Sequence, residues 1–329
     1  MLIAHRPSSV RQYESCWRRF QDYLRGHDVR TVSPNTVLDF LTWLADSTNR
    51  TRATVSAHHA ALADPLHFGM DIQVPQRALS LVLKGIGASR EPKRPPVLAW
   101  SLHRVLQYLA FEGITMGEEH FLQRAVFLLA LATGYRASQL AAVTRHSSFS
   151  KLEEDFSALT LSPSPTFLAK NERADAMIGP VRIPSFLEGG RPHPLCPVRA
   201  FQDYVGRTEG VSEDHLFYNS TSRNPLTPRS VARLLCRVIE NADPGHAPHA
   251  HSIRGLAASL AFLRTHSIER VQDLGGWASA ESFRTRYLYH SVSPVPCVAM
   301  GTAPPLSSQG RRGGAKGRGR PGGRRHRHR

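Results

Sequence analysis

The chain has 329 residues, of which 41% are hydrophobic, and its formal net charge is +16. This length and apolar content suffice for two ordinary domains with buried cores. The four cysteines form no Cys-x-x-Cys pair and no apolar run is as long as a membrane span, so disulfide frameworks, zinc ribbons and membrane proteins are disfavoured and an intracellular protein is expected.

The positive charge is not confined to the C-terminal end of the chain. Residues 311–329 hold nine Lys or Arg and no acid, which leaves +7 of the +16 for the rest. A basic body favours a polyanionic partner, most commonly nucleic acid, although a basic protein without a specific partner is the alternative. The Gly- and Arg-rich residues 299–329 are expected to be a disordered tail that attracts phosphate groups or serves as a nuclear-import signal.

Residues 1–90 predict a helical bundle without strands. A first helix with one apolar face is expected to end at Gly26, and further helices to begin at Ser33, to cover residues 51–62 and to begin at Pro75. Several arginines lie off the apolar faces, where they form either a solvated surface or contacts to DNA phosphates: Arg11, Arg18, Arg19, Arg50 and Arg52.

Residues 88–96 (ASREPKRPP) are the best linker in the chain. They contain three prolines and three basic residues and show no apolar periodicity, which is typical of a semi-rigid spacer. We place the boundary between a first domain, residues 1–90, and a second domain, residues 91–298, in this stretch. Lys93 and Arg94 join the arginines as predicted DNA contacts.

A helix over residues 121–132 is apolar nearly all round, so it is expected to be buried at the centre of the second domain. The turn that follows this helix contains Arg136, whose position the buried helix would fix. Short strand-like runs then predict a small antiparallel sheet with Lys170 at the end of a strand; the runs are residues 158–161, 167–170 and 181–184. Further helices are expected from Pro197 and from Pro228.

The stretch from His249 to His290 carries the densest set of candidate functional residues. His251 and Arg254 are three apart, so on a helix they lie on the same face. Trp277 follows a Gly-Gly turn, and residues 279–289 predict a final short helix that carries Tyr287.

Two of these motifs resemble those of the tyrosine recombinases, the phage-integrase family. Residues 133–140 (TGYRASQL) are similar to the family's T-G-x-R-x-S-E-L motif, except that Gln139 replaces the usual Glu. The H-x-x-R pair, the later Trp and the Tyr about one helix beyond it resemble the family's C-terminal motif. Residues 195–200 (LCPVRA) resemble a stretch found in those members of the family that are carried by eukaryotic mobile elements. With the helical bundle, which resembles the family's core-binding domain, the likeness covers roughly residues 8–290.

The resemblance implies a mainly α fold with a small antiparallel sheet: a core-binding domain over residues 1–90, a catalytic domain over 91–298 and a disordered tail over 299–329. It implies double-stranded DNA as the partner and a homo-oligomer, a tetramer, on that DNA. Neither a metal nor another cofactor is needed. The protein would be DNA-associated, and nuclear if its source is a eukaryote.

The chemistry implied by the resemblance is site-specific cleavage and rejoining of DNA through a 3′-phosphotyrosyl intermediate. Tyr287 would attack phosphorus, and the cations Arg136 and Arg254 would offset the negative charge of the transition state. His251 would act as base or proton relay, because a free tyrosine has a pKa near 10.

Two further residues complete the implied site. Lys170 would protonate the leaving 5′-oxygen, and Trp277 would donate its indole N–H to the phosphate or pack against the tyrosine helix.

Some alternatives remain open at this point. Tyr289 competes with Tyr287 as the nucleophile, and the histidines at 246, 249 and 251 could ligate zinc. A type IB topoisomerase would share the chemistry, and a catalytically silent DNA-binding protein derived from a mobile-element recombinase would share the motifs.

Overall fold

The computed structural model describes residues 7–89, 97–111, 117–167, 179–188, 190–275 and 280–289. The chain divides into two compact units, Met1–Arg94 and Pro95–Arg329. Both are mainly helical and the second also holds a small antiparallel sheet, which confirms the predicted fold class. Within the described ranges, no helix is both long and apolar enough to cross a bilayer.

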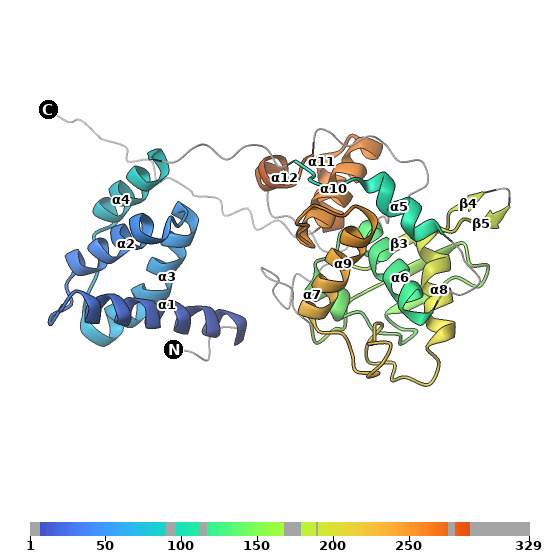
Figure 1. Cartoon of the computed structure of the whole chain (residues 1–329), viewed down its shortest axis with the longest axis horizontal. Helices are drawn as coiled ribbons and strands as arrows, with labels where there is room; N and C mark the ends of the chain where they lie inside the picture. Colours follow the sequence, from blue (N-terminus) through green and yellow to red (C-terminus); the bar gives the residue numbers. More distant parts are fainter. Residues whose placement is uncertain are drawn as a thin grey trace, which may run out of the picture. The chain divides into compact units, whose positions relative to one another are not determined.

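Unit 1 is a bundle whose described part contains four helices (Figure 1): α1 (Pro7–Gly26), α2 (Pro34–Thr48), α3 (Arg52–Met70) and α4 (Gln76–Ala88). The cap expected at Ser33 is present, because its Oγ accepts the N–H of Thr36 while Thr36 Oγ1 accepts the N–H of Ser33. Thr51 caps α3 with a single backbone bond, because its Oγ1 accepts the N–H of Thr54.

The core of unit 1 forms where the apolar faces of these helices meet. Phe20 of α1 packs edge-on against Phe40 of α2, with ring centroids 5.0 Å apart, and both side chains are almost fully buried. Helix α3 continues to Met70, beyond the expected end at residue 62, and includes Pro65. Burial of Leu66 against the same core stabilises this extra segment.

Unit 2 contains, in its described part, the helices α5 (Leu102–Ala110), α6 (Glu118–Thr133), α7 (Ala137–Ala141), α8 (Pro197–Arg207), α9 (Pro228–Ala242), α10 (His251–Thr265), α11 (Ile268–Gly275) and α12 (Ala280–Arg286). Helix α6 lies at the centre, with α8, α9 and α10 packed around it (Figure 1). All residues from Leu122 to Thr133 are buried, which confirms the prediction from their apolar composition.

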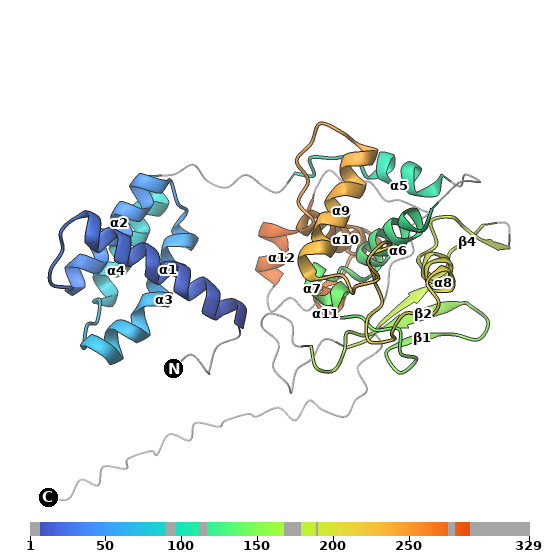
Figure 2. The same ribbon diagram turned by 60° about the horizontal axis from the view of Figure 1, so that its bottom comes forward.

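The main sheet has the strand order β1-β2-β3, antiparallel throughout, and lies to one side of the helices (Figure 2). Its strands are β1 (Ser150–Leu152), β2 (Ala158–Leu161) and β3 (Val181–Pro184), and a separate pair is formed by β4 (Leu187–Glu188) and β5 (Arg191–Pro192). Strands β2 and β3 were predicted. The third expected strand differs: Phe167 is not in a strand, residues 168–170 lie outside the described residues, and β1 pairs with β2.

Candidate active site

The turn after α6 presents Arg136. Gly134 ends the helix in the left-handed region, with φ of 63°, which glycine adopts without steric cost. Thr133 Oγ1 accepts the N–H of Tyr135 and so fixes the turn. Arg136, half-buried, directly precedes α7, and the Oε1 atom of the fully buried Gln139 accepts its backbone N–H at 2.9 Å. Gln139 therefore supplies the acceptor that a glutamate would supply at this position.

Helix α10 brings the second arginine to this turn. Arg254 lies in its first turn and is only 2% exposed, and its Nη1 donates to the carbonyl oxygen of Gly134 at 2.5 Å. The two sequence motifs, 120 residues apart, are thus joined directly. The contact also satisfies a carbonyl at the C-terminal end of α6.

The charges at this point are predominantly positive. Burial, followed by the nearby Arg136 guanidinium, lowers the pKa of Arg254 to about 9, although the charge interaction and the hydrogen bond with Tyr287 act in the opposite direction. His251 is exposed as a residue, but partial desolvation of its ring, together with Arg254 and Arg136, lowers its pKa below the usual 6.5. The site is therefore suited to an anion and keeps His251 neutral at pH 7.

The hydroxyl of Tyr287 lies 2.9 Å from Nε2 of His251, and the two rings meet edge to face with centroids 5.4 Å apart. A neutral imidazole with its proton on Nδ1 can accept the proton of the hydroxyl in this geometry. Tyr287 is not inside the final helix, contrary to the expectation from the sequence, because α12 ends at Arg286. The N–H groups of Tyr287 and Leu288 both donate to the carbonyl of Phe283, which closes the helix end.

Tyr289 occupies a different environment. Tyr289 is 8% exposed. Its burial, and to a smaller extent the neighbouring Tyr287, raise the pKa of its phenol. Its ring packs against Gly255 so closely that a Cβ built on the glycine would lie 2.6 Å from Cε2. Of the two candidate nucleophiles, Tyr287 has its hydroxyl at His251, whereas the ring of Tyr289 packs against the backbone of α10.

The structure thus brings together four of the six residues predicted for the site: Arg136, His251, Arg254 and Tyr287. Lys170 and Trp277 lie outside the described residues, so their places in the site stay predictions.

Several residues around the site were not predicted from the sequence. Trp100 donates its indole N–H to Ser252 Oγ at 3.0 Å, which ties the start of unit 2 to the residue after His251. Ser259 bonds the backbone on both sides of residue 288. A single Trp or Ser without a motif carries no signal of such a role, and the one signal that could have been used is the pair of small residues Gly255 and Ser259, four apart on an apolar helix.

A pocket of about 360 Å³ opens beside the two tyrosines. Its lining includes His251, Tyr287 and Tyr289 together with the apolar residues Val97 and Trp100. The phenol of Tyr287 is therefore accessible from a cavity.

The arginines predicted to contact DNA in unit 1 lie at or near its surface. Arg11, Arg18, Arg50 and Arg52 are exposed, and Arg19 is partly buried. Arg19 and Arg50 come from different segments but are both close enough to His58 to lower its pKa, after the larger effect of burial. Lys93 and Arg94 lie outside the described residues.

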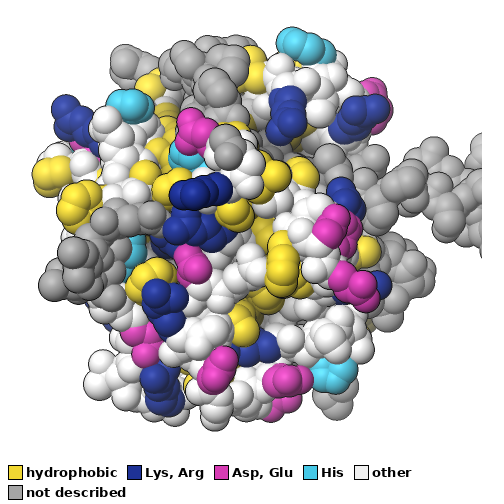
Figure 3. Space-filling model, turned by 90° about the vertical axis from the view of Figure 1, so that its right-hand side faces the viewer, with side chains coloured by type: hydrophobic (Ala, Val, Ile, Leu, Met, Phe, Trp, Pro, Cys, Tyr) yellow, Lys and Arg dark blue, Asp and Glu magenta, His cyan; other side chains and the backbone are white. Residues whose placement is uncertain are grey.

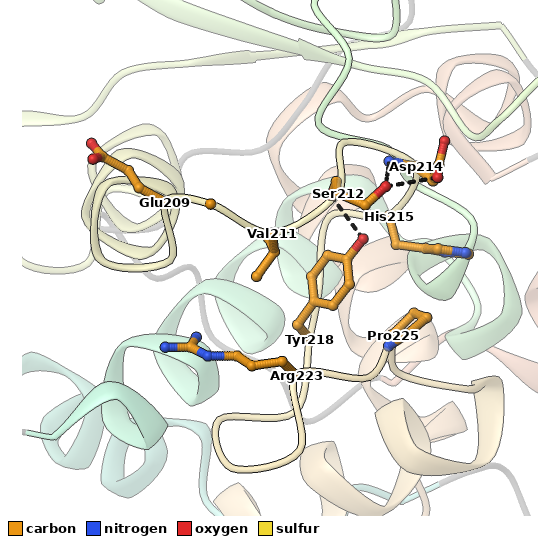
Figure 4. A pocket seen from close by; sticks show the side chains of 9 residues that line it. Glu209, Val211, Ser212, Asp214, His215, Tyr218, Arg223 and Pro225 are labelled. Atoms are coloured by element: carbon orange, nitrogen blue, oxygen red, sulfur yellow. Dashed lines mark hydrogen bonds between the residues drawn. The ribbon is translucent and has the colours of Figure 1, made fainter.

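Two other parts of the surface of unit 2 carry groups of both charges. A pocket of about 580 Å³ is lined by residues of the α8–α9 connection (Figure 4), and several of its polar groups already have partners. Ser212 Oγ donates to Asp214 Oδ2 and Tyr218 OH to Ser212 O, both at 2.7 Å, while Arg223 forms an ion pair with Glu118. On the face of unit 2 drawn in Figure 3, Lys and Arg side chains are interspersed with Asp and Glu.

The histidines that could have ligated zinc have different partners. His246 Nδ1 lies 3.6 Å from a carboxylate oxygen of Asp243, and His251 faces Tyr287. In the part of the chain that the structure describes, no group of three or more His, Cys, Asp or Glu side chains could hold a metal ion.

No protein-family model and no curated protein matches the sequence. Solved structures do match. The site-specific recombinase XerH, bound to palindromic difH substrate in a post-cleavage complex, gives a TM-score of 0.60 at 17% identity, over 84% of this chain and 75% of that one. The Tn1549 transposon integrase in complex with transposon right end DNA gives 0.57 at 13% identity, over 83% and 87%. A lambda integrase dimer bound to a core site gives 0.51 at 17% identity, over 85% and 89%. The chain therefore has the fold of the tyrosine recombinases, the family that its motifs resemble.

Proposed function

We propose that this protein is a tyrosine recombinase or integrase that cleaves and rejoins double-stranded DNA through a 3′-phosphotyrosyl intermediate. The observation that carries the proposal is the contact of the Tyr287 hydroxyl with His251, on the same helix as the buried Arg254 and beside Arg136. A phenol, a neutral imidazole and two guanidiniums are the groups that phosphoryl transfer to tyrosine requires.

Attack by the Tyr287 oxygen forms a P–O bond to the phenol and breaks the bond to the 5′-oxygen of the next nucleotide. Negative charge grows on the non-bridging oxygens, and one planar guanidinium can donate two parallel hydrogen bonds to such oxygens. Arg254 is held rigidly by Gly134, so it needs little reorganisation as the transition state forms. Removal of one such donor typically costs about 2.7–4 kcal/mol of transition-state stabilisation.

The protons move at both ends of the reaction. His251 accepts the phenolic proton, because its lowered pKa keeps it neutral at pH 7. We assign protonation of the leaving 5′-oxygen to Lys170 and a contact to the phosphate or to the tyrosine segment to Trp277. Both assignments rest on the resemblance of the sequence.

The test is trapping of the covalent intermediate. The probe is a pool of nicked DNA duplexes with a randomised centre, so that religation is prevented and no target sequence is assumed. The wild-type protein should form an adduct that survives denaturing electrophoresis, and sequencing of the attached DNA should show a shared site with the protein at the 3′ end.

Two tyrosine variants separate the candidate nucleophiles. Tyr287→Phe should abolish the adduct, whereas Tyr289→Phe should retain it, because the hydroxyl of Tyr289 is not at His251. The reverse result would make Tyr289 the nucleophile. DNA binding without any adduct would favour a silent DNA-binding protein, and relaxation of a supercoiled plasmid without a shared site would favour a topoisomerase.

The partner and assembly follow from the same proposal. We propose that unit 1 contacts DNA phosphates through Arg11, Arg18, Arg19, Arg50 and Arg52, and that Lys93 and Arg94 add to this surface. We further propose a tetramer on DNA, an origin in a mobile element and, in a eukaryotic source, a nuclear location.

A further inference from the structure

Ser259 makes an unusual set of contacts in the middle of α10. Its side chain is fully buried, two helical turns beyond His251. Its Oγ lies 2.8 Å from the backbone nitrogen of Tyr289, 2.9 Å from the carbonyl oxygen of Tyr287 and 2.9 Å from that of Gly255. One atom therefore contacts the backbone on both sides of Leu288.

The hydroxyl chemistry makes this contact directional. A serine hydroxyl has one proton to donate and can accept in return. Ser259 accepts the N–H of Tyr289 and shares its own proton between the carbonyls of Tyr287 and Gly255. Loss of the hydroxyl would leave the buried N–H of Tyr289 without this partner, and buried polar groups without partners are costly.

Gly255 completes the receiving surface on α10. A side chain at this position would overlap the Tyr289 ring, with a Cβ 2.6 Å from Cε2 and 3.2 Å from the hydroxyl oxygen. Gly255 immediately follows Arg254, so the seat for Tyr289 and the buried cation are on adjacent residues of one helix.

We propose that Ser259 and Gly255 are positioning residues for the nucleophile: they seat Tyr289 and so fix the phenol of Tyr287 between His251 and Arg254. Tyr289 is the anchor of the segment and Tyr287 its reactive group. The inference rests on the proposed role of Tyr287, and it adds two residues that touch neither DNA nor the reacting atoms.

The first test compares three variants of α10 in single-turnover cleavage of the trapped substrate. Ser259→Ala should slow adduct formation at least about tenfold, the equivalent of one net hydrogen bond, with DNA affinity unchanged. Ser259→Thr keeps the hydroxyl and should recover most of the rate. Thr265→Val is the matched control, because Thr265 also bonds a carbonyl four residues back, that of Ala261, while its other hydrogen bonds go to Ser267 and not to the tyrosine segment.

The second test uses the steric fit. Gly255→Ala should slow cleavage, and Gly255→Ala combined with Tyr289→Leu should recover part of the rate, because leucine lacks the outer ring atoms that overlap the new methyl group. Full activity of Gly255→Ala, or a double variant no faster than the single one, would overturn the role of the Gly255–Tyr289 contact.

A third measurement does not depend on catalysis. In protein labelled with ¹³Cζ-tyrosine, the Tyr287 signal is assigned by its loss in Tyr287→Phe. The signal should shift in Ser259→Ala and stay in place in Thr265→Val. If the wild-type protein forms no adduct, the proposed function fails, but the shift of the Tyr287 signal still decides whether Ser259 positions this residue. An unmoved Tyr287 signal in Ser259→Ala would refute the positioning role. Cleavage by Ser259→Ala at the wild-type rate would also refute it.

Discussion

Replacing Arg254 by methionine tests the electrostatic design of the site, because it removes a buried cation that faces another cation. The pKa of Arg254 falls well below that of a free guanidinium, to about 9. At about 1.4 kcal/mol for each tenfold change, this difference corresponds to about 5 kcal/mol against the charged form in the folded protein. The pKa values of the folded and of the unfolded protein both lie above neutral pH, so the full penalty applies at pH 7.5 and fades only as the pH rises above about 9.

The lost contacts of Arg254 reduce the expected gain. Its hydrogen bond to the carbonyl of Gly134 contributes about 1.5–3 kcal/mol, as is typical of bonds from charged groups. Methionine has a similar length and fills irregular space. We therefore expect Arg254→Met to stabilise the DNA-free protein by about 2 kcal/mol, which raises Tm by about 4–8 °C for a unit of this size. The same change should slow adduct formation by about 100- to 1000-fold.

Arg124 provides the matched control. It is also almost fully buried, at 1% exposure on α6, but its guanidinium pairs with the carboxylate of Asp203. Arg124→Met would leave Asp203 with Arg199 at 3.7 Å and should lower stability by about 3 kcal/mol.

Thermal unfolding of both variants at pH 7.5, each beside the wild type, gives the comparison. Opposite shifts of Tm are expected for two chemically identical substitutions. If Arg254→Met lowers Tm as Arg124→Met does, burial of Arg254 and its repulsion from Arg136 do not outweigh the contacts that this side chain makes, and the expected gain in stability is wrong.

Two further predictions concern protonation and the departure from the family motif. Burial, Arg254 and Arg136 lower the pKa of His251 below 6.5. The cleavage rate should therefore be constant between pH 8 and pH 7 and should fall only below pH 6.5, where the imidazole becomes protonated. A pH–rate profile with a midpoint above 6.5 would contradict this. The lowered pKa also means that the unfolded chain binds the proton of His251 more readily than the folded protein does. The free energy of unfolding is therefore unaffected by this residue above pH 6.5 and decreases as the pH falls below it. The Nε2 group of Gln139 is buried without a hydrogen-bond partner, while Oε1 holds the N–H of Arg136. Gln139→Glu keeps the acceptor and adds a negative charge beside the arginines, so its Tm should be at least that of the wild type, whereas Gln139→Ala should lose about 1–3 kcal/mol; equal losses in both would refute the reasoning.

Local signals made much of the fold predictable. The caps at Ser33 and Thr51 are formed by side chains that bond their own next helical turn, so they can be recognised without knowledge of the rest of the fold. The buried helix α6 was predicted from apolar residues on all sides. The H-x-x-R spacing also predicted correctly that His251 and Arg254 lie close together, because both residues are in one turn of a helix.

Tertiary contacts decided the parts that the sequence could not predict. The final helix was expected to continue through Tyr289, but the N–H of Tyr289 bonds Ser259 on another helix instead of a carbonyl of its own. Strand β1 (Ser-Lys-Leu) has no distinct pattern of its own and is defined by its pairing with β2. The contact of Arg254 with Gly134 joins two distant segments, which no local pattern of residues reveals.

Helix α10 is the common reference for most of the site. It carries His251 and Arg254, it holds the tyrosine segment through Ser259 and Gly255, and it packs against α6, after which a short turn presents Arg136. The cations are thus fixed by a buried helix pair, whereas the segment that carries the phenol follows a seven-residue helix and is joined to α10 by the Ser259 hydroxyl and the Gly255 contact. A small displacement of residues 287–289 would therefore move the nucleophile out of line while the two arginines stay in place.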